Sequence, residues 1–259
     1  MVSPRAAARW LFRIWFWSPR FPEPAREARY RQSARAESLA YDPGPISVYL
    51  WGEGPGVLLI HGWSGRGAQL GAFIEPLVRK GYRVIAFDAP GHGRSPGHGT
   101  DAFMVTDIVT RLEQAYGPFH GIIGHSFGAL CTVMSLARGV VARKAVTLSS
   151  PTQLPWLLEG FFKYMRLTPR TIAAFRRLAE RQYGTDVWQQ TSADFLAPNL
   201  AVPCLIVHDR DDRDVACRQS ELLATAWPGS ELLITQGLGH RRILRDEKVI
   251  AAVCDFITT

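Results

Sequence analysis

The chain has 259 residues, of which 47% are hydrophobic and 20% are charged. That length and composition indicate a folded chain with a sizeable core, and they exclude a disordered or repetitive protein. The formal net charge of +7 falls mostly on residues 1–37, which hold eight arginines against three glutamates. Because the rest of the chain shows no basic stripe interleaved with aromatic side chains, we expect no nucleic-acid partner.

Residues 1–45 form a basic N-terminal extension ahead of the first predicted strand. A helix over residues 5–17 would be amphipathic, with arginines on one face and apolar side chains on another: Arg5, Arg9 and Arg13, and Trp10, Ile14 and Trp17. Its length of roughly 20 Å is too short for a hydrocarbon core of about 30 Å. We expect its aromatic face to pack on the domain or close over a site. Peripheral membrane contact through residues 5–17 is the alternative.

The extension lacks the features of a cleaved secretion signal. Arg9 and Arg13 interrupt the apolar stretch, and no small-residue cleavage site precedes Pro19. The cysteines match neither a zinc spacing nor a redox pair, which indicates reduced, mostly buried thiols: Cys131, Cys204, Cys217 and Cys254. The expected location is cytoplasmic, and peripheral at the inner membrane surface if residues 5–17 contact a membrane.

From Ile46 onward, short apolar runs alternate with longer segments of helical period. This pattern is typical of an α/β fold with a mostly parallel central sheet flanked by helices. Strands are predicted at residues 46–51, 57–62, 83–88, 120–125, 144–150, 204–209 and 231–236. Helices are predicted at residues 68–82, 101–117, 127–139, 217–227 and 246–257, the second of them capped by Thr100.

The alternation is interrupted where about fifty residues replace an ordinary connection between two predicted strands. Residues 154–184 have helical spacing, are rich in aromatic side chains and are broken by Pro155 and Pro169. We predict that residues 151–198 form a helical cap inserted into a core made of residues 46–150 and 199–259.

The sequence Gly124-His125-Ser126-Phe127-Gly128 matches G-x-S-x-G between a predicted strand and a predicted helix. A sharp turn at this place lifts the Ser126 hydroxyl out of the sheet, because the flanking glycines leave room for the turn. The turn also points the Phe127 N–H, at a helix N-terminus, toward an oxyanion above Ser126. Ser126 is therefore the predicted nucleophile, and His125 is expected to point away from it.

A serine nucleophile needs a base and an acid that orients the base. His240, on a glycine-flanked loop before the last predicted helix, is the predicted base, and His208 is its competitor. The loop that begins at the end of the strand at 204–209 offers several carboxylates for the acid: Asp209, Asp211, Asp212 and Asp214. We choose Asp212, because the loop there can turn back toward His240, with Asp214 as the runner-up.

A second oxyanion donor is expected from the loop after the strand at 57–62. The sequence His61-Gly62-Trp63-Ser64-Gly65 begins at the end of this strand. Its glycines let the backbone approach a bound acyl group, so the Trp63 N–H would join that of Phe127. The His61 side chain would then be structural. A plain tight turn is the alternative interpretation.

The order Ser126, Asp212, His240, together with HGWSG, DAPGHGRS and GHSFG, resembles the α/β-hydrolase superfamily over about residues 46–258. Within it the chain is similar to small bacterial serine hydrolases with a helical cap after the sixth strand. A serine at the elbow argues against the dehalogenase and epoxide-hydrolase branches, which use aspartate there. Two features depart from the family pattern: Asp209 replaces a frequent glycine, and the basic extension is not part of the shared fold.

The motifs predict a serine hydrolase that cleaves carboxylic esters of small to medium size through an acyl-serine intermediate. The same triad serves thioesterases, lactonases, C–C hydrolases and acyltransferases, and a slow-turnover ligand-binding protein on the same fold is a further alternative. Aromatic residues in the cap favour a small-molecule substrate with an apolar group. Nothing in the sequence indicates a metal site or an organic cofactor.

Overall fold

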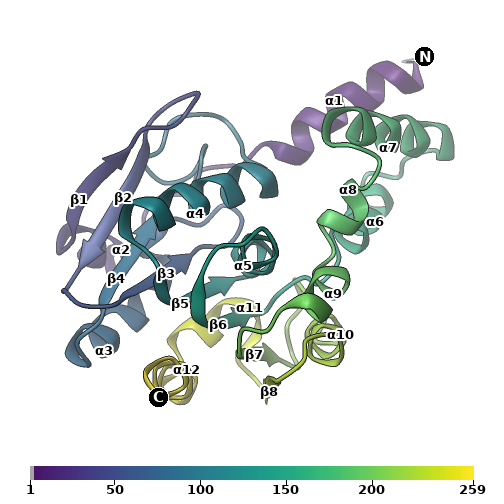
Figure 1. The fold of residues 1–259 in the computed structure, drawn as a ribbon. Helices are drawn as coiled ribbons and strands as arrows, with labels where there is room; N and C mark the ends of the chain where they lie inside the picture. The colour runs from purple at the N-terminus through teal and green to yellow at the C-terminus, as the bar shows by residue number, and fades with distance from the viewer. Residues whose placement is uncertain (1–2) are drawn as a thin grey trace.

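The computed structural model describes residues 3–259, so the first two residues of the predicted extension lie outside it. These described residues form one eight-stranded sheet with helices on both of its faces (Figure 1). The strands in chain order are β1 (Arg35–Leu39), β2 (Ile46–Trp51), β3 (Gly56–Ile60), β4 (Arg83–Phe87), β5 (Phe119–His125), β6 (Ala142–Leu148), β7 (Cys204–Asp209) and β8 (Ser230–Thr235).

The order of the strands across the sheet is β1-β2-β4-β3-β5-β6-β7-β8. β2 is antiparallel to both of its neighbours, β1 and β4, and the other neighbouring pairs are parallel. The predicted mostly parallel sheet is therefore confirmed. Because parallel strands end at the same edge, the loops after β3, β5, β7 and β8 converge there.

The helices connect the strands and form the cap. The first half of the chain holds α1 (Pro4–Phe16), α2 (Ala25–Gln32), the 3₁₀ helix η1 (Gly67–Phe73), α3 (Ile74–Arg79), α4 (Ala102–Tyr116) and α5 (Phe127–Ala137). The second half holds α6 (Leu154–Tyr164), α7 (Pro169–Tyr183), α8 (Val187–Gln190), α9 (Ala193–Leu196), η2 (Ala197–Asn199), α10 (Arg218–Ala226), α11 (Gly239–Arg242), η3 (Ile243–Arg245) and α12 (Glu247–Thr258).

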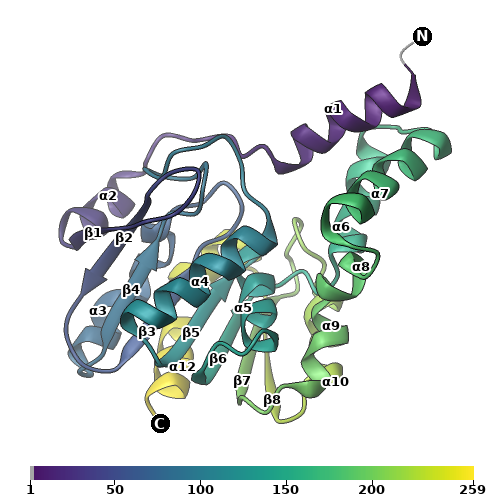
Figure 2. The same ribbon diagram turned by 45° about the horizontal axis from the view of Figure 1, so that its top comes forward.

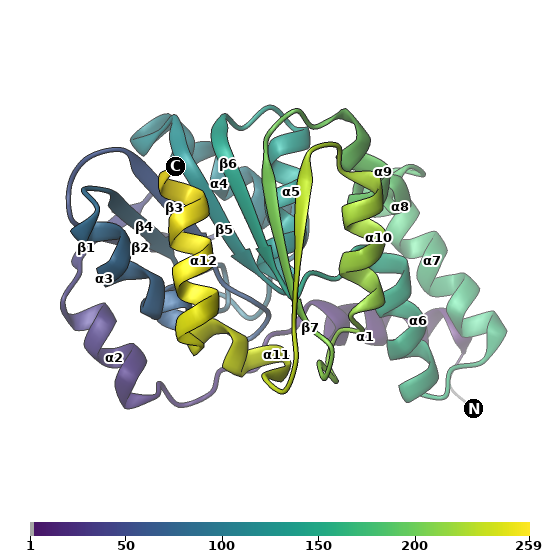
Figure 3. The ribbon, with the colours of Figure 1, turned by 90° about the horizontal axis from the view of Figure 1, so that it is seen from below.

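Two apolar cores lie on the two faces of the sheet, and Figure 3 shows the layers from below. One core joins the sheet to α4, α5 and α10, with Leu112, Leu130 and Trp227 among its buried side chains. The other joins the sheet to α3 and α12, with Leu77 and Val253 among its buried side chains. β3 lies between these cores and is buried along its whole length, which explains its continuous apolar run.

Three features of the sheet and its flanking helices differ from the sequence prediction. β1 lies inside the segment expected as an extension; it is an exposed edge strand, so it carries no apolar run that a pattern could reveal. The single helix expected at residues 68–82 is η1 followed by α3. The N-cap of α4 is Asp101 and not Thr100, because the Asp101 carboxylate accepts the Met104 N–H at 2.8 Å.

The cap follows β6, as expected, but it includes a helix from the other end of the chain. Helix α1 lies along α7, away from the sheet (Figure 2). A separate apolar cluster holds α1, α6 and α7 together, and its buried side chains include Phe12, Leu158, Phe162 and Phe175. We call these three helices the cap lobe. Pro155 and Pro169, read in the sequence as breaks, each lie in the first turn of a cap helix.

The face through which α1 packs is not the predicted one. Its buried residues are Ala8, Leu11 and Phe12, whereas Trp10 is 62% exposed and Trp17 is 55% exposed. The helix therefore packs on the domain, as the first interpretation expects, and presents its two tryptophans outward. The inserted segment of residues 151–198 packs on the core at its C-terminal end. There Ala193 and Ala197 join the buried cluster beside α5 and α10.

Candidate active site

Ser126 lies at a strained turn between the end of β5 and the start of α5. Its φ of 53° and ψ of −121° place it in a region that residues with a side chain rarely adopt. A Cβ on Gly124 would lie 2.5 Å from the Gly128 carbonyl oxygen. A Cβ on Gly128 would lie 2.5 Å from the His61 carbonyl oxygen. Glycine is therefore required at both positions, and the turn brings Ser126 to the pocket wall.

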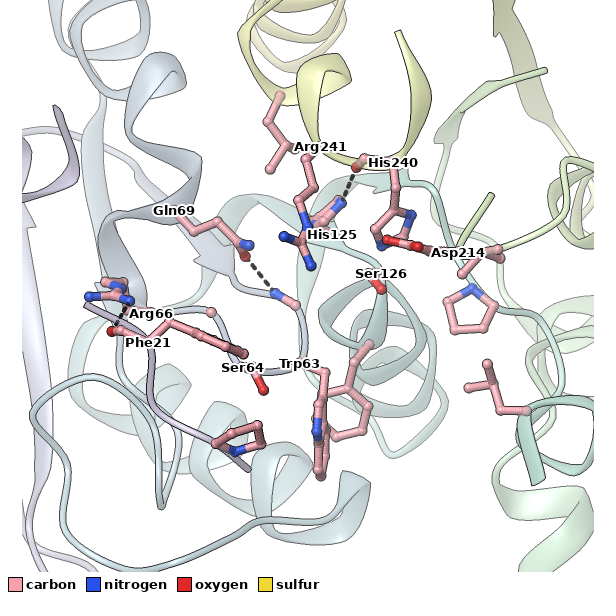
Figure 4. A pocket seen from close by; sticks show the side chains of 18 of the residues that line it. Phe21, Trp63, Ser64, Arg66, Gln69, His125, Ser126, Asp214, His240 and Arg241 are labelled. Carbon is pink, nitrogen blue, oxygen red and sulfur yellow. Dashed lines mark hydrogen bonds between the residues drawn. The ribbon is translucent and has the colours of Figure 1, made fainter. Parts of the chain in front are cut away.

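His240 lies in the short helix α11, in the connection that follows β8. Its Nδ1 lies 2.7 Å from Oδ2 of Asp212. A carboxylate can only accept, so Nδ1 carries the proton and donates it, which leaves Nε2 with a free lone pair. In Figure 4 the His240 and Ser126 side chains lie beside each other on the pocket wall. Within residues 3–259 no hydrogen bond joins the Ser126 hydroxyl to His240.

Asp212 is the carboxylate that the structure pairs with His240, and its side chain is fully buried. Burial alone would raise the pKa of Asp212. Hydrogen bonds from His208, from His240 and from the Val215 N–H outweigh burial and hold that pKa well below its ordinary value. Oδ1 accepts the N–H groups of Asp214 and Val215, both at 2.9 Å. Asp212 is therefore a fixed anion.

The other three carboxylates of this loop have different partners. Asp209 is buried and accepts the N–H groups of Leu238 at 3.0 Å and Gly239 at 2.8 Å. These bonds fix the backbone immediately before His240. The Asp211 carboxylate accepts the Gly237 N–H at 2.9 Å. Asp214 lines the pocket, and within residues 3–259 the hydrogen bond and ion pair of His240 Nδ1 go to Asp212 and not to Asp214.

His208, the competitor for the base, is fully buried and is not among the residues that line the pocket. Its Nε2–H donates to the Val215 carbonyl at 3.0 Å and lies 3.3 Å from the Asp212 carboxylate. Its Nδ1 accepts the Ser220 hydroxyl at 2.6 Å. These bonds use both ring nitrogens, so His208 supports Asp212 from behind.

His125 has a role that the sequence reasoning missed. Its Nε2–H donates to the backbone carbonyl of His240 at 2.9 Å, and the two rings lie 4.8 Å apart. The sequence analysis expected only that His125 points away from Ser126. It could not reveal the hydrogen bond to His240, because the two residues are 115 positions apart in the sequence. His125 therefore ties the nucleophile turn to the loop that carries the base.

Trp63 and Phe127, the predicted oxyanion donors, line the same pocket as Ser126. Within residues 3–259, neither the Trp63 N–H nor the Phe127 N–H donates a hydrogen bond to another protein group. Their rings pack edge to face, with centroids 5.0 Å apart. The Gln69 side chain accepts the Gly62 N–H at 2.8 Å and holds this loop in place. A Cβ on Gly62 would lie 3.2 Å from Ser126 Cβ, so glycine allows the close approach.

Buried neutral histidines hold the loop that carries Trp63. His92 Nε2 accepts the Ser64 N–H at 3.0 Å, and His61 Nε2 accepts the Ala89 N–H at 3.0 Å. Burial lowers the pKa of His61 to about 4 and the pKa of His92 to about 3. The pKa of His125 also falls to about 3, first through burial and then through the nearby His240. His61 has the structural place predicted for it.

Ser126 and His240 line a cavity of about 680 Å³. Trp63 and Phe127 also line it, and Figure 4 shows Trp63 on the wall near Ser126. The cap lines it with Leu154, Leu157 and Phe161. The end of α1 forms a further wall, in agreement with the expectation that this helix closes over a site, and the segment after α1 extends that wall beyond the prediction: Ile14, Trp15, Phe16, Trp17, Pro19, Phe21 and Pro22. The dense aromatic and proline content of this segment was the available signal.

In residues 3–259, no group of three or more histidine, cysteine, aspartate or glutamate side chains could hold a metal ion. Over the same range, no helix has both the length and the apolar character needed to cross a bilayer.

The chain matches a family model described as the alpha/beta hydrolase family over residues 57–253. It is 30% identical over 183 residues to an sn-1-specific diacylglycerol lipase of Xenopus laevis. That match covers 65% of this chain and 56% of the relative, so the chain spans just over half of the relative's length. It is 27% identical to a non-heme haloperoxidase of Rhodococcus erythropolis, with 73% of this chain and 87% of the other covered.

Among solved structures, an esterase from Exiguobacterium antarcticum is similar to this chain with a TM-score of 0.65 at 19% identity. The superposition covers 85% of this chain and 98% of the esterase. At that level of identity the likeness concerns the fold alone.

Proposed function

Because the chain belongs to the alpha/beta hydrolase family, as its motifs predict, we propose that it hydrolyses carboxylic esters of small to medium size through an acyl-serine intermediate. The observation that carries this proposal is the combination around one pocket of the strained Ser126, the His240 and Asp212 pair, and two unpaired amides. Family membership alone would fit many reactions, so the proposal depends on these side chains.

In the first half of the reaction, Ser126 Oγ attacks the ester carbonyl carbon while His240 Nε2 takes the hydroxyl proton. Asp212 stabilises the imidazolium that forms, because its carboxylate is held ionised and already bonded to Nδ1. The Trp63 and Phe127 amides donate to the oxyanion. His240 then gives its proton to the leaving alcohol, and the carbonyl re-forms as an acyl-serine.

In the second half, water attacks the acyl-serine and His240 takes one of its protons. The oxyanion of the tetrahedral intermediate then re-forms the carbonyl double bond, and the bond between the acyl carbon and Ser126 Oγ breaks. His240 gives its proton to Ser126 Oγ as the acid product leaves. The same two amides serve both tetrahedral intermediates. Losing one such donor typically costs about a hundredfold to a thousandfold in turnover. Two amides that are free to bind an oxyanion therefore support the proposal.

The pocket supports an apolar acyl or alcohol group. Its walls above Ser126 come from Leu154, Leu157 and Phe161 of the cap and from Trp17 and Phe21. A cavity of about 680 Å³ lies in the range of pockets that bind small organic molecules. The names of three similar proteins, a diacylglycerol lipase and two esterases, describe enzymes that cleave esters, which supports an ester substrate here.

The test is hydrolysis of p-nitrophenyl esters from acetate to palmitate by the intact chain and by Ser126→Ala. We expect a chain-length optimum in the wild type and a fall in turnover of about a millionfold in Ser126→Ala. Ser64→Ala is the matched control, since Ser64 lines the same pocket but its hydroxyl has no base partner within residues 3–259. It should stay within about threefold of wild type.

Retention of most ester hydrolysis by Ser126→Ala would remove Ser126 as the nucleophile. A wild-type chain that releases no acid but transfers the acyl group to an added alcohol or thiol would make it an acyltransferase. Tight retention of one small ligand without turnover would make it a binding protein.

A further inference from the structure

The net charge of the molecule is concentrated in the cap lobe. Helices α1, α6 and α7, together with the turn that joins α6 to α7, carry nine arginines and lysines against Glu159 and Glu180, a balance equal to the +7 of the whole chain. All nine basic side chains belong to exposed residues: Arg5, Arg9, Arg13, Lys163, Arg166, Arg170, Arg176, Arg177 and Arg181. The sheet and its flanking helices are therefore close to neutral, and the lobe has a strong positive field.

Helix α1 presents a face that combines charge with large aromatic rings. It packs on α7 through Ala8, Leu11 and Phe12, so its opposite face points to solvent. That outward face carries Arg9, Trp10, Arg13 and, directly after the helix, Trp17. Within residues 3–259 none of the three α1 arginines makes a salt bridge. We call Arg5, Arg9, Trp10, Arg13, Trp17 and Phe21 the N-terminal face.

The N-terminal face ends at the mouth of the active-site pocket. Trp17 and Phe21 are 55% and 59% exposed, yet both line the cavity that holds Ser126. The backbone between them is fixed to the core, because the Ser18 hydroxyl donates to the Gly91 carbonyl at 2.9 Å and Arg20 donates to the Ser95 carbonyl at 2.6 Å. The face and the pocket entrance therefore have a fixed relative position.

Exposed tryptophans beside unpaired arginines match the chemistry of a bilayer surface. Tryptophan rings favour the headgroup level, where one edge is apolar and the other is wet, and arginines favour anionic headgroups. An acidic protein would attract the same arginines but would not by itself explain two solvent-facing tryptophans. The combination of both residue types on one helix face therefore favours a lipid surface.

We propose that the N-terminal face docks on the surface of an anionic lipid bilayer, which presents the pocket entrance to that surface. The chain then draws its ester substrate from the bilayer, a part that rests on the proposed function. The substrate class is an amphiphilic acyl ester that partitions into membranes. The apolar face of α1 stays packed on α7, so docking requires no unfolding of the cap lobe.

The test is sedimentation of the full chain with vesicles of phosphatidylglycerol mixed with phosphatidylcholine, and with vesicles of phosphatidylcholine alone. We expect binding to the anionic vesicles only. The variant Arg5→Gln, Arg9→Gln, Arg13→Gln should lower the partition coefficient on the order of 100-fold. Trp10→Ala, at an exposed position, should lower it roughly tenfold, because the ring no longer enters the headgroup layer.

A charge-matched control separates the N-terminal face from net charge alone. Arg79→Gln, Arg143→Gln, Arg218→Gln removes three exposed arginines from α3, β6 and α10. It should stay within about threefold of wild type, since charges more than about 10 Å from the bilayer are screened. Hydrolysis of a soluble p-nitrophenyl ester by all three variants should be unchanged, which tests the proposed function independently of docking.

Equal binding by the α1 arginine variant and by wild type would overturn the proposal, as would absence of wild-type binding to anionic vesicles. If soluble polyglutamate displaces the chain fully and Trp10→Ala binds like wild type, the occupant is an acidic macromolecule and the lipid assignment is wrong. If docking is found but soluble esters are not hydrolysed, docking stands and the proposed function fails.

Discussion

The pocket has a floor and a roof that are stabilised in different ways. The floor consists of the loops after β3, β5, β7 and β8, where buried polar groups hold each catalytic candidate by directed hydrogen bonds. The roof is the cap lobe with residues 14–22, where aromatic rings such as Phe12 and Phe175 pack with centroids 5.2 Å apart. Directed bonds fix atomic positions, whereas apolar packing tolerates adjustment. We infer that the floor determines the chemistry and the roof selects the substrate.

The largest effect should come from the floor, with Asp212→Asn. The amide keeps the shape of the carboxylate but can present an N–H to His240 Nδ1, which stabilises the wrong imidazole tautomer. We expect turnover of a soluble ester to fall about ten-thousandfold. Steady-state kinetics measures this loss, and circular dichroism checks that the fold is intact.

Asp211→Asn and Asp214→Asn are the matched controls on the same loop. Because neither carboxylate makes a hydrogen bond or ion pair with His240 within residues 3–259, each should keep turnover within about threefold of wild type. An equally large loss in Asp214→Asn, with Asp212→Asn nearly active, would transfer the role of the acid to the runner-up.

The next effect concerns the contact between His125 and the His240 backbone. His125→Leu removes the donor to the His240 carbonyl, so the imidazole of His240 loses its fixed distance from Ser126. A displacement of about 1 Å can reduce turnover about 100-fold. We expect kcat of His125→Leu to fall by that factor, while KM stays within about threefold of wild type. His125→Gln restores an N–H near the position of Nε2, so its kcat should be at least about tenfold higher than that of His125→Leu.

A purely structural role for His125 predicts a different pattern. Both substitutions would then lower the thermal midpoint in parallel with the amount of active enzyme, and active-site titration would show unchanged kcat per folded molecule.

A smaller effect should follow from disturbing the roof. Phe12→Ala opens the cluster between α1 and α7, a change that costs about 3–5 kcal/mol of packing free energy. It loosens the wall formed by residues 14–22 without touching the floor. We expect KM for a medium-chain ester to rise roughly tenfold, while kcat/KM for the acetate ester changes less than threefold.

Trp10→Ala is the control for this prediction, since it removes an exposed ring from the same helix. It should leave KM for both soluble esters unchanged. If Phe12→Ala affects the acetate and medium-chain esters equally, the roof does not select the substrate and the comparison between floor and roof fails.

The smallest effect is a pH dependence of stability that originates in the floor. Burial lowers the pKa of His92 to about 3, whereas the unfolded chain binds the proton near pH 6.5. The unfolded state thus takes up more protons as pH falls below about 6.5, and folded stability decreases there. From about pH 7 to about pH 6, His92 should contribute a loss of about 0.7 kcal/mol.

His92→Gln tests this contribution, because an amide oxygen can still accept the Ser64 N–H but does not titrate. Urea unfolding at the two pH values should show a pH dependence smaller by about that amount. His98→Gln, at an exposed residue of the same loop, should leave the pH dependence as it is in wild type. An identical pH dependence in His92→Gln and wild type would contradict a neutral, buried His92.

The sequence predicts the floor better than the roof for a physical reason. G-x-S-x-G and HGWSG are local in the chain, since the turns at Ser126 and Gly62 impose their glycines directly. The alternating apolar runs reveal the central strands because both of their faces are buried. The hydrogen bond from His125 to His240 spans 115 positions and has no local pattern.

The roof depends on contacts between segments that are distant in sequence. The periodicity of α1 predicts an amphipathic helix. Which face is buried, the one with Trp10 or the one with Phe12, depends on packing against α7, which lies more than 150 residues later in the chain. β1 has no apolar run because it lies at the edge of the sheet. Those features become visible only when the whole chain is folded.

The central claim is that His240, oriented by Asp212, activates the Ser126 hydroxyl. The most direct measurement is the rate at which a fluorophosphonate labels the intact chain, followed by mass spectrometry of the labelled peptide. We predict one adduct, on the peptide that contains Ser126, with labelling at least about a thousandfold slower in His240→Ala. An adduct on another residue, or equal labelling rates in His240→Ala and wild type, would contradict the account.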